Sequence, residues 1–387
     1  MSDSRTLDAA ILGAGIAGSC LAILLARRGW KVALIDRQSF PRHKVCGEFL
    51  SPDAVEALVA LGLEERLQSL RPAVIRSARL DFGSRNPVNA QLPGAAWGIS
   101  RYALDAALHD EARLAGADVA TGTAVGAVRL WDGGYELDMK RGAAQVSIRS
   151  RSVIGAWGGN GRIPDMPGAQ RRRLSPCPYV GVKTHLSGIE LDGELELYFF
   201  AGGYLGLSSA GDGIVNAAAL LDQRSFRHVP STVTGWLEAA GQRNPRLARR
   251  IAEARPAGGT QTAVAPVRLF DPPLAWNGIP LIGDACVTIP PLCGDGMSMA
   301  IRSAQLCAIS ADRCLRSQTT QEQWKIEYTK AIDRHFRHPL RWGRLLQRVA
   351  GNPSFTILAA AAAGRLPSVV ARLVKATRLG KTEVLPW

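Results

Sequence analysis

The stretch LDAAILGAGIAG, at residues 7–18, decides the fold. Its apolar first half is typical of a buried strand, and the glycines then open an apolar run that suits a helix ending at Gly29. Gly13 suits a tight turn, Gly15 leaves room for a pyrophosphate, and Gly18 lets the helix pack closely on the strand. The free N–H groups at the start of such a helix favour phosphate.

A second strand follows at residues 31–35 and ends in Asp36, roughly twenty residues past the glycines. A carboxylate at that point accepts hydrogen bonds from the ribose hydroxyls of an adenosine. Strand, turn, helix, second strand and acid occur in the expected order, so a glycine turn without a ligand is a poor explanation. The pattern predicts a dinucleotide site but does not distinguish FAD from NAD.

Length and composition restrict the class of protein. The 387 residues, 47% hydrophobic and 21% charged, suit a folded chain of two domains or one domain with an insertion. The seven cysteines are scattered without a C-x-x-C pair, which argues against a zinc site or a disulfide framework. With no leader-like segment and no apolar run of bilayer length in the sequence, a cytoplasmic protein is the simplest expectation. The net charge of +14 leaves an acidic partner, a membrane surface or nucleic acid open.

The next informative stretch is FPRHKVCGEFLSP, residues 40–52. Taken alone it is a basic surface loop that leads into a helix. Together with the glycine turn it resembles the geranylgeranyl reductase-like FAD-dependent oxidoreductases, which have the para-hydroxybenzoate hydroxylase-type flavoprotein fold and an Arg-x-Lys-x-Cys-Gly loop beside the flavin. The resemblance implies FAD as the cofactor. It places Arg42 and Lys44 near the cofactor phosphates or ring, with Cys46 and Gly47 facing the isoalloxazine.

Later stretches match the same family. Arg101 opens a predicted helix and either contacts FAD, as the resemblance implies, or pairs with Asp105 one turn on. A buried strand ends in Asp284, and a glycine-rich turn then opens a helix at about Met297, whose N–H groups stabilise negative charge on a reduced flavin. Asp295 in that turn is an extra acid that suits a helix cap. The cofactor contacts implied by motif and resemblance are Gly13, Gly15, Gly18, Asp36, Arg37, Arg42, Lys44, Cys46, Gly47, Arg101, Val125, Asp284, Gly294, Gly296 and Met297.

Residues 178–221 predict an antiparallel sheet. Apolar and acidic residues alternate over 189–197, which predicts a strand pair turning at Asp192-Gly193 with one solvated face. The aromatic, glycine-rich run 198–207 resembles the family stretch that lines the substrate cavity, although the family's Tyr-x-Trp-x-Phe-Pro and the halogenases' Trp-x-Trp-x-Ile-Pro are both absent. Glycine at position 206 implies a roomier pocket, and the missing halogenase motif argues against halogenation. The implied pocket residues are Tyr198, Phe200, Tyr204, Gly206 and Pro291.

The resemblance extends to about residue 310. It implies an α/β fold: a doubly wound, Rossmann-like FAD-binding domain with an inserted antiparallel β-sheet substrate domain and a helical C-terminal region. The expected boundaries are 1–70, 97–170 and 270–330 for the FAD-binding domain, 71–96 and 171–269 for the substrate domain, and 331–387 for the helical region.

The C-terminal region predicts two basic amphipathic helices. Trp342, Leu345, Leu346 and Val349 fall at helical spacing beside arginines, and Leu366, Val369, Val370 and Leu373 repeat the pattern. Such helices either cap the cofactor domain or lie on an anionic membrane surface, and the first role is the expected one. No nucleic-acid motif occurs, so no nucleic-acid partner is expected.

Two activities stay open on the sequence. The favoured one is an FAD-dependent monooxygenase that oxygenates a hydrophobic polyketide, phenolic or isoprenoid-like molecule through a flavin C4a-hydroperoxide. The alternative is a flavin-dependent reductase of carbon–carbon double bonds, and a distant third is a basic protein without enzymatic activity. Trp157 stands where the aromatic hydroxylases have an aspartate that takes part in their handling of NADPH. The sequence therefore leaves the electron source open among NADPH, NADH and a separate flavin reductase. Cys46 and Glu48 are the candidate catalytic residues, with Cys46 either a proton donor or a small packing residue.

Overall fold

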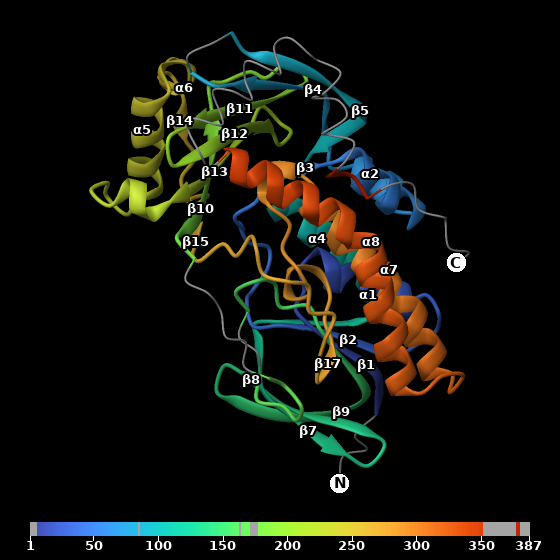
Figure 1. The fold of residues 1–387 in the computed structure, drawn as a ribbon. Coiled ribbons are helices and arrows are strands. Elements are labelled where there is room, and N and C mark those ends of the chain that lie inside the picture. Colours follow the sequence, from blue (N-terminus) through green and yellow to red (C-terminus); the bar gives the residue numbers. More distant parts are fainter. Residues whose placement is uncertain (1–5, 84–85, 162–163, 171–176, 351–376, 380–387) are drawn as a thin grey trace.

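The computed structural model describes residues 6–83, 86–161, 164–170, 177–350 and 377–379. Two β-sheets dominate these residues. The six-stranded sheet lies at one end of the molecule and the nine-stranded sheet at the other, and the long helix α8 runs from one toward the other (Figure 1). The fold is mixed α/β, as the sequence predicts.

The six-stranded sheet has the order β6-β2-β1-β9-β8-β7. Its first four strands are parallel, and β8 and β7 complete it as an antiparallel meander. The predicted strand–turn–helix–strand is confirmed as β1 (Leu7–Leu12), α1 (Ile16–Ala26) and β2 (Val32–Asp36). The other strands are β6 (Asp118–Thr121), β7 (Thr123–Trp131), β8 (Gly134–Arg141) and β9 (Ala144–Gly155).

The nine-stranded sheet has the order β14-β10-β13-β12-β11-β4-β5-β3, with β15 also paired to β10. All its pairs are antiparallel except β11 with β4. The strands are β3 (Phe49–Leu50), β4 (Ala73–Asp81), β5 (Val88–Gly98), β10 (Tyr179–Ser187), β11 (Glu194–Phe200), β12 (Gly203–Ser209), β13 (Val215–Asp222), β14 (Arg255–Pro256) and β15 (Thr262–Val264).

Two details of this sheet differ from expectation. The alternating residues 189–197 do not form a strand pair, because β11 begins only at Glu194 and residues 189–193 are a loop closed by Gly193 at φ +69°. Strand β3 lies within the segment 1–70 expected in the FAD-binding domain, yet it pairs with β5 of the second sheet.

The two faces of the nine-stranded sheet differ. Helices α5 (Val233–Arg243) and α6 (Pro245–Ile251) contribute Leu237 and Leu247 to the core on one face. Side chains alternate along a strand, so neighbours in sequence face opposite ways. The opposite face carries a separate core around Phe199, Tyr204 and Leu220.

The remaining helices cover the six-stranded sheet and bridge the molecule. The buried helix α1 packs against α7 and α4. Helix α8 packs on α7 through buried Trp324, Tyr328, Ile332 and Phe336, and the Tyr328 hydroxyl donates to the Leu281 carbonyl at 2.8 Å. The other elements are α2 (Pro52–Ala60), α3 (Glu64–Gln68), α4 (Arg101–Leu114), α7 (Gly296–Leu315), α8 (Gln321–Ala350), the short strands β16 (Trp276–Asn277) and β17 (Ile279–Pro280), and the 3₁₀ turns η1 (Gln223–Phe226), η2 (Gly283–Ala285) and η3 (Pro291–Cys293).

The end of α8 buries a different stripe from the predicted one. Leu340, Gly343 and Gln347 face inward, whereas Leu345 is 48% exposed. The second predicted stripe, residues 366–373, lies outside the described residues. Among the residues that the structure describes, no helix is both long and apolar enough to cross a membrane.

Candidate functional site

The glycine turn leaves an open cradle at the start of α1. A Cβ on Gly13 would lie 2.3 Å from the Ala156 carbonyl oxygen, and one on Gly18 would lie 1.9 Å from the Gly13 carbonyl oxygen, so both glycines are required for packing. A Cβ on Gly15 would meet nothing nearer than Arg101 Nη2, at 3.9 Å. This free space at a helix N-terminus suits a pyrophosphate.

The acid at the end of β2 lies beside this turn. Asp36 Oδ2 accepts a hydrogen bond from the Ala14 N–H at 2.8 Å, and its Oδ1 accepts one from the Gln38 N–H at 2.8 Å. These bonds hold the half-buried carboxylate at the edge of the cradle, where a ribose would bind. Arg37 is exposed just behind it, and Val125 lies in β7.

Two buried cations face the same region. Arg101 Nε and Nη2 donate to the Asp105 carboxylate at 3.0 and 2.8 Å, so the predicted ion pair is formed, and Nη2 still points toward the Gly15 cradle. Burial lowers the pKa of Lys44, and the charge of Arg101 lowers it further, against the opposing effects of Asp284 and Asp105. Clustered cations of this kind suit the pyrophosphate of FAD.

The N-terminus of α7 forms the other side. Gly294 adopts φ +69°, Gly296 opens the helix, and Met297 is buried behind it. Asp295 occupies the predicted N-cap position of α7, but its side chain makes no capping bond to the helix N–H groups. Its buried carboxylate instead pairs with Arg378 at 2.7 Å. Burial raises the pKa of Asp295 to about 6.

The loop before β3 holds the two candidate catalytic side chains. Asn216 Nδ2 donates to the Cys46 carbonyl at 3.0 Å, and the Glu48 N–H donates to the Cys46 sulfur at 3.4 Å. The Arg101 guanidinium lies close enough to the Cys46 side chain to interact with it electrostatically. Cys46 is half-buried, whereas Gly47 is exposed with open space around its Cα.

Glu48 is fully buried, and its carboxylate is occupied by donors. It accepts from Lys183 Nζ at 2.7 Å, His185 Nε2 at 2.6 Å and the Arg101 N–H at 2.9 Å. Burial raises the pKa of Glu48, but the His185 hydrogen bond and the Lys183 charge outweigh it, and the net result is a lowered pKa. A carboxylate so enclosed is not placed to exchange protons with a substrate, which removes the catalytic interpretation of Glu48.

Sequence reasoning missed four residues of this cluster: His43, Lys183, His185 and Asn216. His43 stacks on Tyr102 with ring centroids 4.9 Å apart, and its Nδ1 lies 3.4 Å from Lys183 Nζ. Burial and the Lys183 charge lower the pKa of His43. The signal in the sequence was present, because Lys183 and His185 alternate with apolar Val182 and Leu186 and therefore share a strand face.

The predicted substrate-pocket residues divide between the two sheet faces. Gly206 and Ala218 pair with each other, Ala218 pairs with Lys183, and these positions face the cofactor loop together with Tyr204. The Tyr204 hydroxyl is buried without a hydrogen-bond partner among the described residues. Burial, with Cys293 nearby, raises its pKa.

Tyr198 and Phe200 lie on the other face, in the core under α5 and α6, so their assignment to the pocket is wrong. The run 198–207 was taken as one surface, but alternation along β11 turns these two side chains away. Pro291 is exposed in η3.

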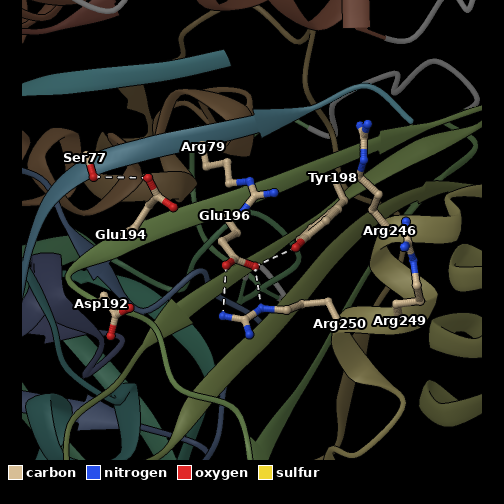
Figure 2. Close-up of a pocket in the computed structure, with 9 residues that line it drawn as sticks. All are labelled: Ser77, Arg79, Asp192, Glu194, Glu196, Tyr198, Arg246, Arg249 and Arg250. Atoms are coloured by element: carbon tan, nitrogen blue, oxygen red, sulfur yellow. Dashed lines mark hydrogen bonds and ion pairs between the residues drawn. The ribbon is translucent and has the colours of Figure 1, made fainter. Parts of the chain in front are cut away.

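A polar hollow of about 660 Å³ opens on the Tyr198 side of the sheet (Figure 2). Its centre is Glu196, which accepts from the Tyr198 hydroxyl at 2.6 Å and from Arg250 Nε at 3.0 Å. The acidic residues that the sequence places on a solvated face therefore lie here, away from the cofactor loop. The lining residues are Ser77, Arg79, Asp192, Glu194, Glu196, Tyr198, Arg246, Arg249 and Arg250.

Comparisons with known proteins agree with this geometry. The FAD binding domain family model matches residues 6–183. Digeranylgeranylglycerophospholipid reductase 2 of Methanopyrus kandleri is 24% identical over 89% of this chain and 87% of its own. Menaquinone reductase of Mycobacterium tuberculosis is 29% identical over 80% of this chain and 77% of its own. Squalene monooxygenase of Candida glabrata is 37% identical, but over only 18% of this chain and 14% of its own.

The solved structures support the fold. The geranylgeranyl bacteriochlorophyll reductase-like protein of Thermoplasma acidophilum superposes with a TM-score of 0.75 over 98% of this chain and 94% of its own, at 20% identity. Fold and site together define an FAD-dependent oxidoreductase. FAD is its cofactor, and along most of its length the chain is similar to geranylgeranyl reductase-like flavoproteins.

Proposed function

We propose that this oxidoreductase reduces a carbon–carbon double bond in a hydrophobic, isoprenoid-like small molecule. The observation that carries the proposal is the Cys46 thiol, held at its sulfur by the Glu48 N–H and lying near the Arg101 charge, on the loop between the cofactor cradle and the second sheet. Two relatives that align along most of this chain bear the names of reductases, which supports the same choice. This order of preference is the reverse of the one favoured on sequence alone.

Different residues of the site suit the cofactor phosphates and the flavin ring. The open cradle at Gly15, with Arg101 and Lys44, suits the cofactor phosphates. The start of α7 directs its N–H groups toward negative charge on the flavin. Bound FAD, once reduced by an external donor, supplies the hydride.

Cys46 would donate the balancing proton from its sulfur to the second carbon of the double bond. The thiolate that remains would lie near the positive charge of Arg101 until it takes a proton from solvent.

A monooxygenase acting on a hydrophobic small molecule is the second candidate. One observation favours it. Position 206 is glycine, so the sheet face that is turned toward the cofactor loop lacks the bulky aromatic side chain of the family's reductases. The short match to squalene monooxygenase points the same way. Both candidates use the same FAD site and differ in whether oxygen is a substrate.

Anaerobic single turnover separates the two. The purified holoprotein is reduced chemically without oxygen and mixed with a prenylated quinone or a geranylgeranyl-bearing lipid. A reductase reoxidises its flavin under these conditions, and mass spectrometry finds a product that has gained one hydride and one proton. If the flavin stays reduced until oxygen is admitted and the product then contains an added oxygen atom, the reductase proposal is wrong and the monooxygenase is established.

A further inference from the structure

We propose that Glu48 is a positioning residue, which with Lys183, His185 and Asn216 clamps the Cys46-Gly47 loop between the cofactor domain and the nine-stranded sheet. The clamp fixes the thiol relative to the flavin. The inference rests on the flavin site of the proposed function, but not on the choice between reduction and oxygenation.

The backbone of Glu48 is the first observation. It adopts φ +53°, in the left-handed region that a side-chain-bearing residue rarely occupies. Such a conformation persists where the surroundings determine it, and it occurs mainly at functional sites. Here it follows the exposed Gly47 and directs the Glu48 side chain into the interior, toward β10.

The partners come from two parts of the molecule. Lys183 and His185 belong to β10 of the nine-stranded sheet. The third donor is the backbone N–H of Arg101, the first residue of α4, and α4 packs on the FAD-binding helix α1. The Glu48 and Lys183 side chains are both 0% exposed, at a separation of 2.7 Å. A buried ion pair adds little net stability, but removing one partner leaves an unpaired buried charge and is strongly destabilising. Such a pair therefore suits a role in fixing geometry.

The clamp acts on Cys46 at two atoms, its carbonyl oxygen and its sulfur. Asn216 holds the Cys46 carbonyl at 3.0 Å, and Asn216 pairs with His185 on the adjacent strand, so the two attachment points are neighbours on one sheet face. The Glu48 N–H holds the Cys46 sulfur from the following turn at 3.4 Å. Arg101 binds the Glu48 carboxylate through its backbone N–H, and its guanidinium charge lies near the Cys46 side chain. Moving the Glu48 carboxylate would therefore move the thiol.

Three variants of the holoprotein test the clamp. Glu48→Gln keeps the size of the side chain and removes its charge, and Lys183→Met removes the opposing charge. The double variant Glu48→Gln/Lys183→Met removes both, so it leaves no uncompensated buried charge and stays foldable where a single variant does not. The matched control is Glu196→Gln, because Glu196 is also a buried carboxylate of this sheet, paired to Arg250, but lies on the face away from the cofactor loop (Figure 2).

The readouts require no substrate. They are the FAD occupancy, the visible spectrum of the bound flavin, and the rate at which Cys46 is alkylated, followed by peptide mass spectrometry. We expect the clamp variants to retain FAD but to change the alkylation rate severalfold and to shift the flavin spectrum. Glu196→Gln should lower the thermal stability and leave both the Cys46 alkylation rate and the flavin spectrum unchanged.

An unchanged Cys46 alkylation rate and flavin spectrum in the double variant would overturn the clamp. So would equal changes in Glu196→Gln, which would show a general loss of structure. Failure of the proposed reaction would appear only in turnover and leave these readouts intact.

Discussion

At the scale of single residues, the cofactor loop combines one reactive side chain with several that hold it. Cys46 is half-buried near the Arg101 charge, whereas Glu48 is enclosed by donors. The two candidate catalytic residues of the sequence therefore have different roles. In the proposed reaction the Cys46 thiol gives its proton to the substrate, whereas the Glu48 carboxylate is hydrogen-bonded within the protein.

Substitution of the thiol tests its role. Cys46→Ser preserves size but replaces the thiol with a much weaker acid, so a proton donor predicts a loss of turnover of about 10²-fold, the usual scale for acid–base groups. FAD occupancy should be unchanged, as measured by the ratio of flavin to protein absorbance. Near-normal turnover would assign Cys46 to packing and favour the monooxygenase.

The Gly15 cradle gives a second prediction at this scale. In Gly15→Val the new Cβ meets no protein atom closer than 3.9 Å, so the fold tolerates it, but the side chain occupies the space of the pyrophosphate. We expect FAD binding to be lost in a protein of normal far-ultraviolet circular dichroism. The control is Gly258→Val, since a Cβ there also meets nothing within 4 Å and lies outside the cofactor site. Full flavin occupancy in Gly15→Val would place the cofactor elsewhere.

At the scale of elements, local sequence predicted more than long-range pairing. The β1–α1–β2 unit was predictable because its period and glycines are local, and so was the Ser100 cap of α4, whose hydroxyl accepts from the Ala103 N–H at 3.2 Å. The partner of Glu48 was not, because Lys183 is 135 residues away and only the pairing of strands brings it near. The faces of β11 and β12 were missed for the same reason, since alternation gives a period but not which side is covered.

The two tyrosines on opposite sheet faces should respond differently to loss of their hydroxyls. Tyr198→Phe removes a hydrogen bond to the Glu196 carboxylate and should cost about 1–3 kcal/mol of unfolding free energy without affecting turnover. Tyr204→Phe removes a buried hydroxyl without a partner among the described residues, so stability should not fall, while KM or turnover changes if the hydroxyl meets the substrate. Denaturant unfolding and kinetics of both variants check this, and equal behaviour would mean that the two faces are not functionally distinct.

The N-terminus of α7 predicts a pH dependence of stability. Burial raises the pKa of Asp295 from about 3.8 to about 6, so its folded state binds protons more tightly than the unfolded chain. The resulting stability is complete below pH 3.8 and is lost as the pH rises to 6, a change on the order of 3 kcal/mol. Asp295→Asn cannot titrate, so the free energy of unfolding of the parent, minus that of the variant, should decline from pH 3.8 to pH 6. Denaturant titrations at several pH values measure this difference. A constant difference would contradict the raised pKa.

At the scale of the whole molecule, the site is assembled from segments far apart in the chain. The described C-terminal residues return to it: Arg378 pairs with Asp295, and the Leu379 N–H donates to Asp53 at 3.1 Å beside the start of α2. The cofactor cradle, the Cys46 loop and the α7 N-terminus thus depend on both sheets and on the end of the chain. The sequence as a whole carries a formal net charge of +14.

On the outer side of α8, positively charged side chains lie beside exposed apolar ones. Arg341, Leu345 and Arg348 are exposed at helical spacing, and the Arg348 guanidinium lies 5.4 Å from the ring centre of half-exposed Phe270. We call these four residues the α8 patch. A basic surface with exposed apolar side chains has the composition of a face that adsorbs to anionic lipid, where an isoprenoid-like substrate would dissolve.

Binding to vesicles tests the α8 patch. The holoprotein should sediment with vesicles of anionic lipid and not with neutral ones, and binding should weaken as salt screens the charges. Arg341→Ala/Arg348→Ala removes two charges near the surface, each worth about 1 kcal/mol, so affinity should fall about fivefold per arginine. The control Arg76→Ala/Arg255→Ala removes the same charge from exposed positions on the nine-stranded sheet and should bind nearly as the parent does. Equal losses in both variants would assign any binding to net charge, and no binding at low salt would leave α8 only its structural role against α7.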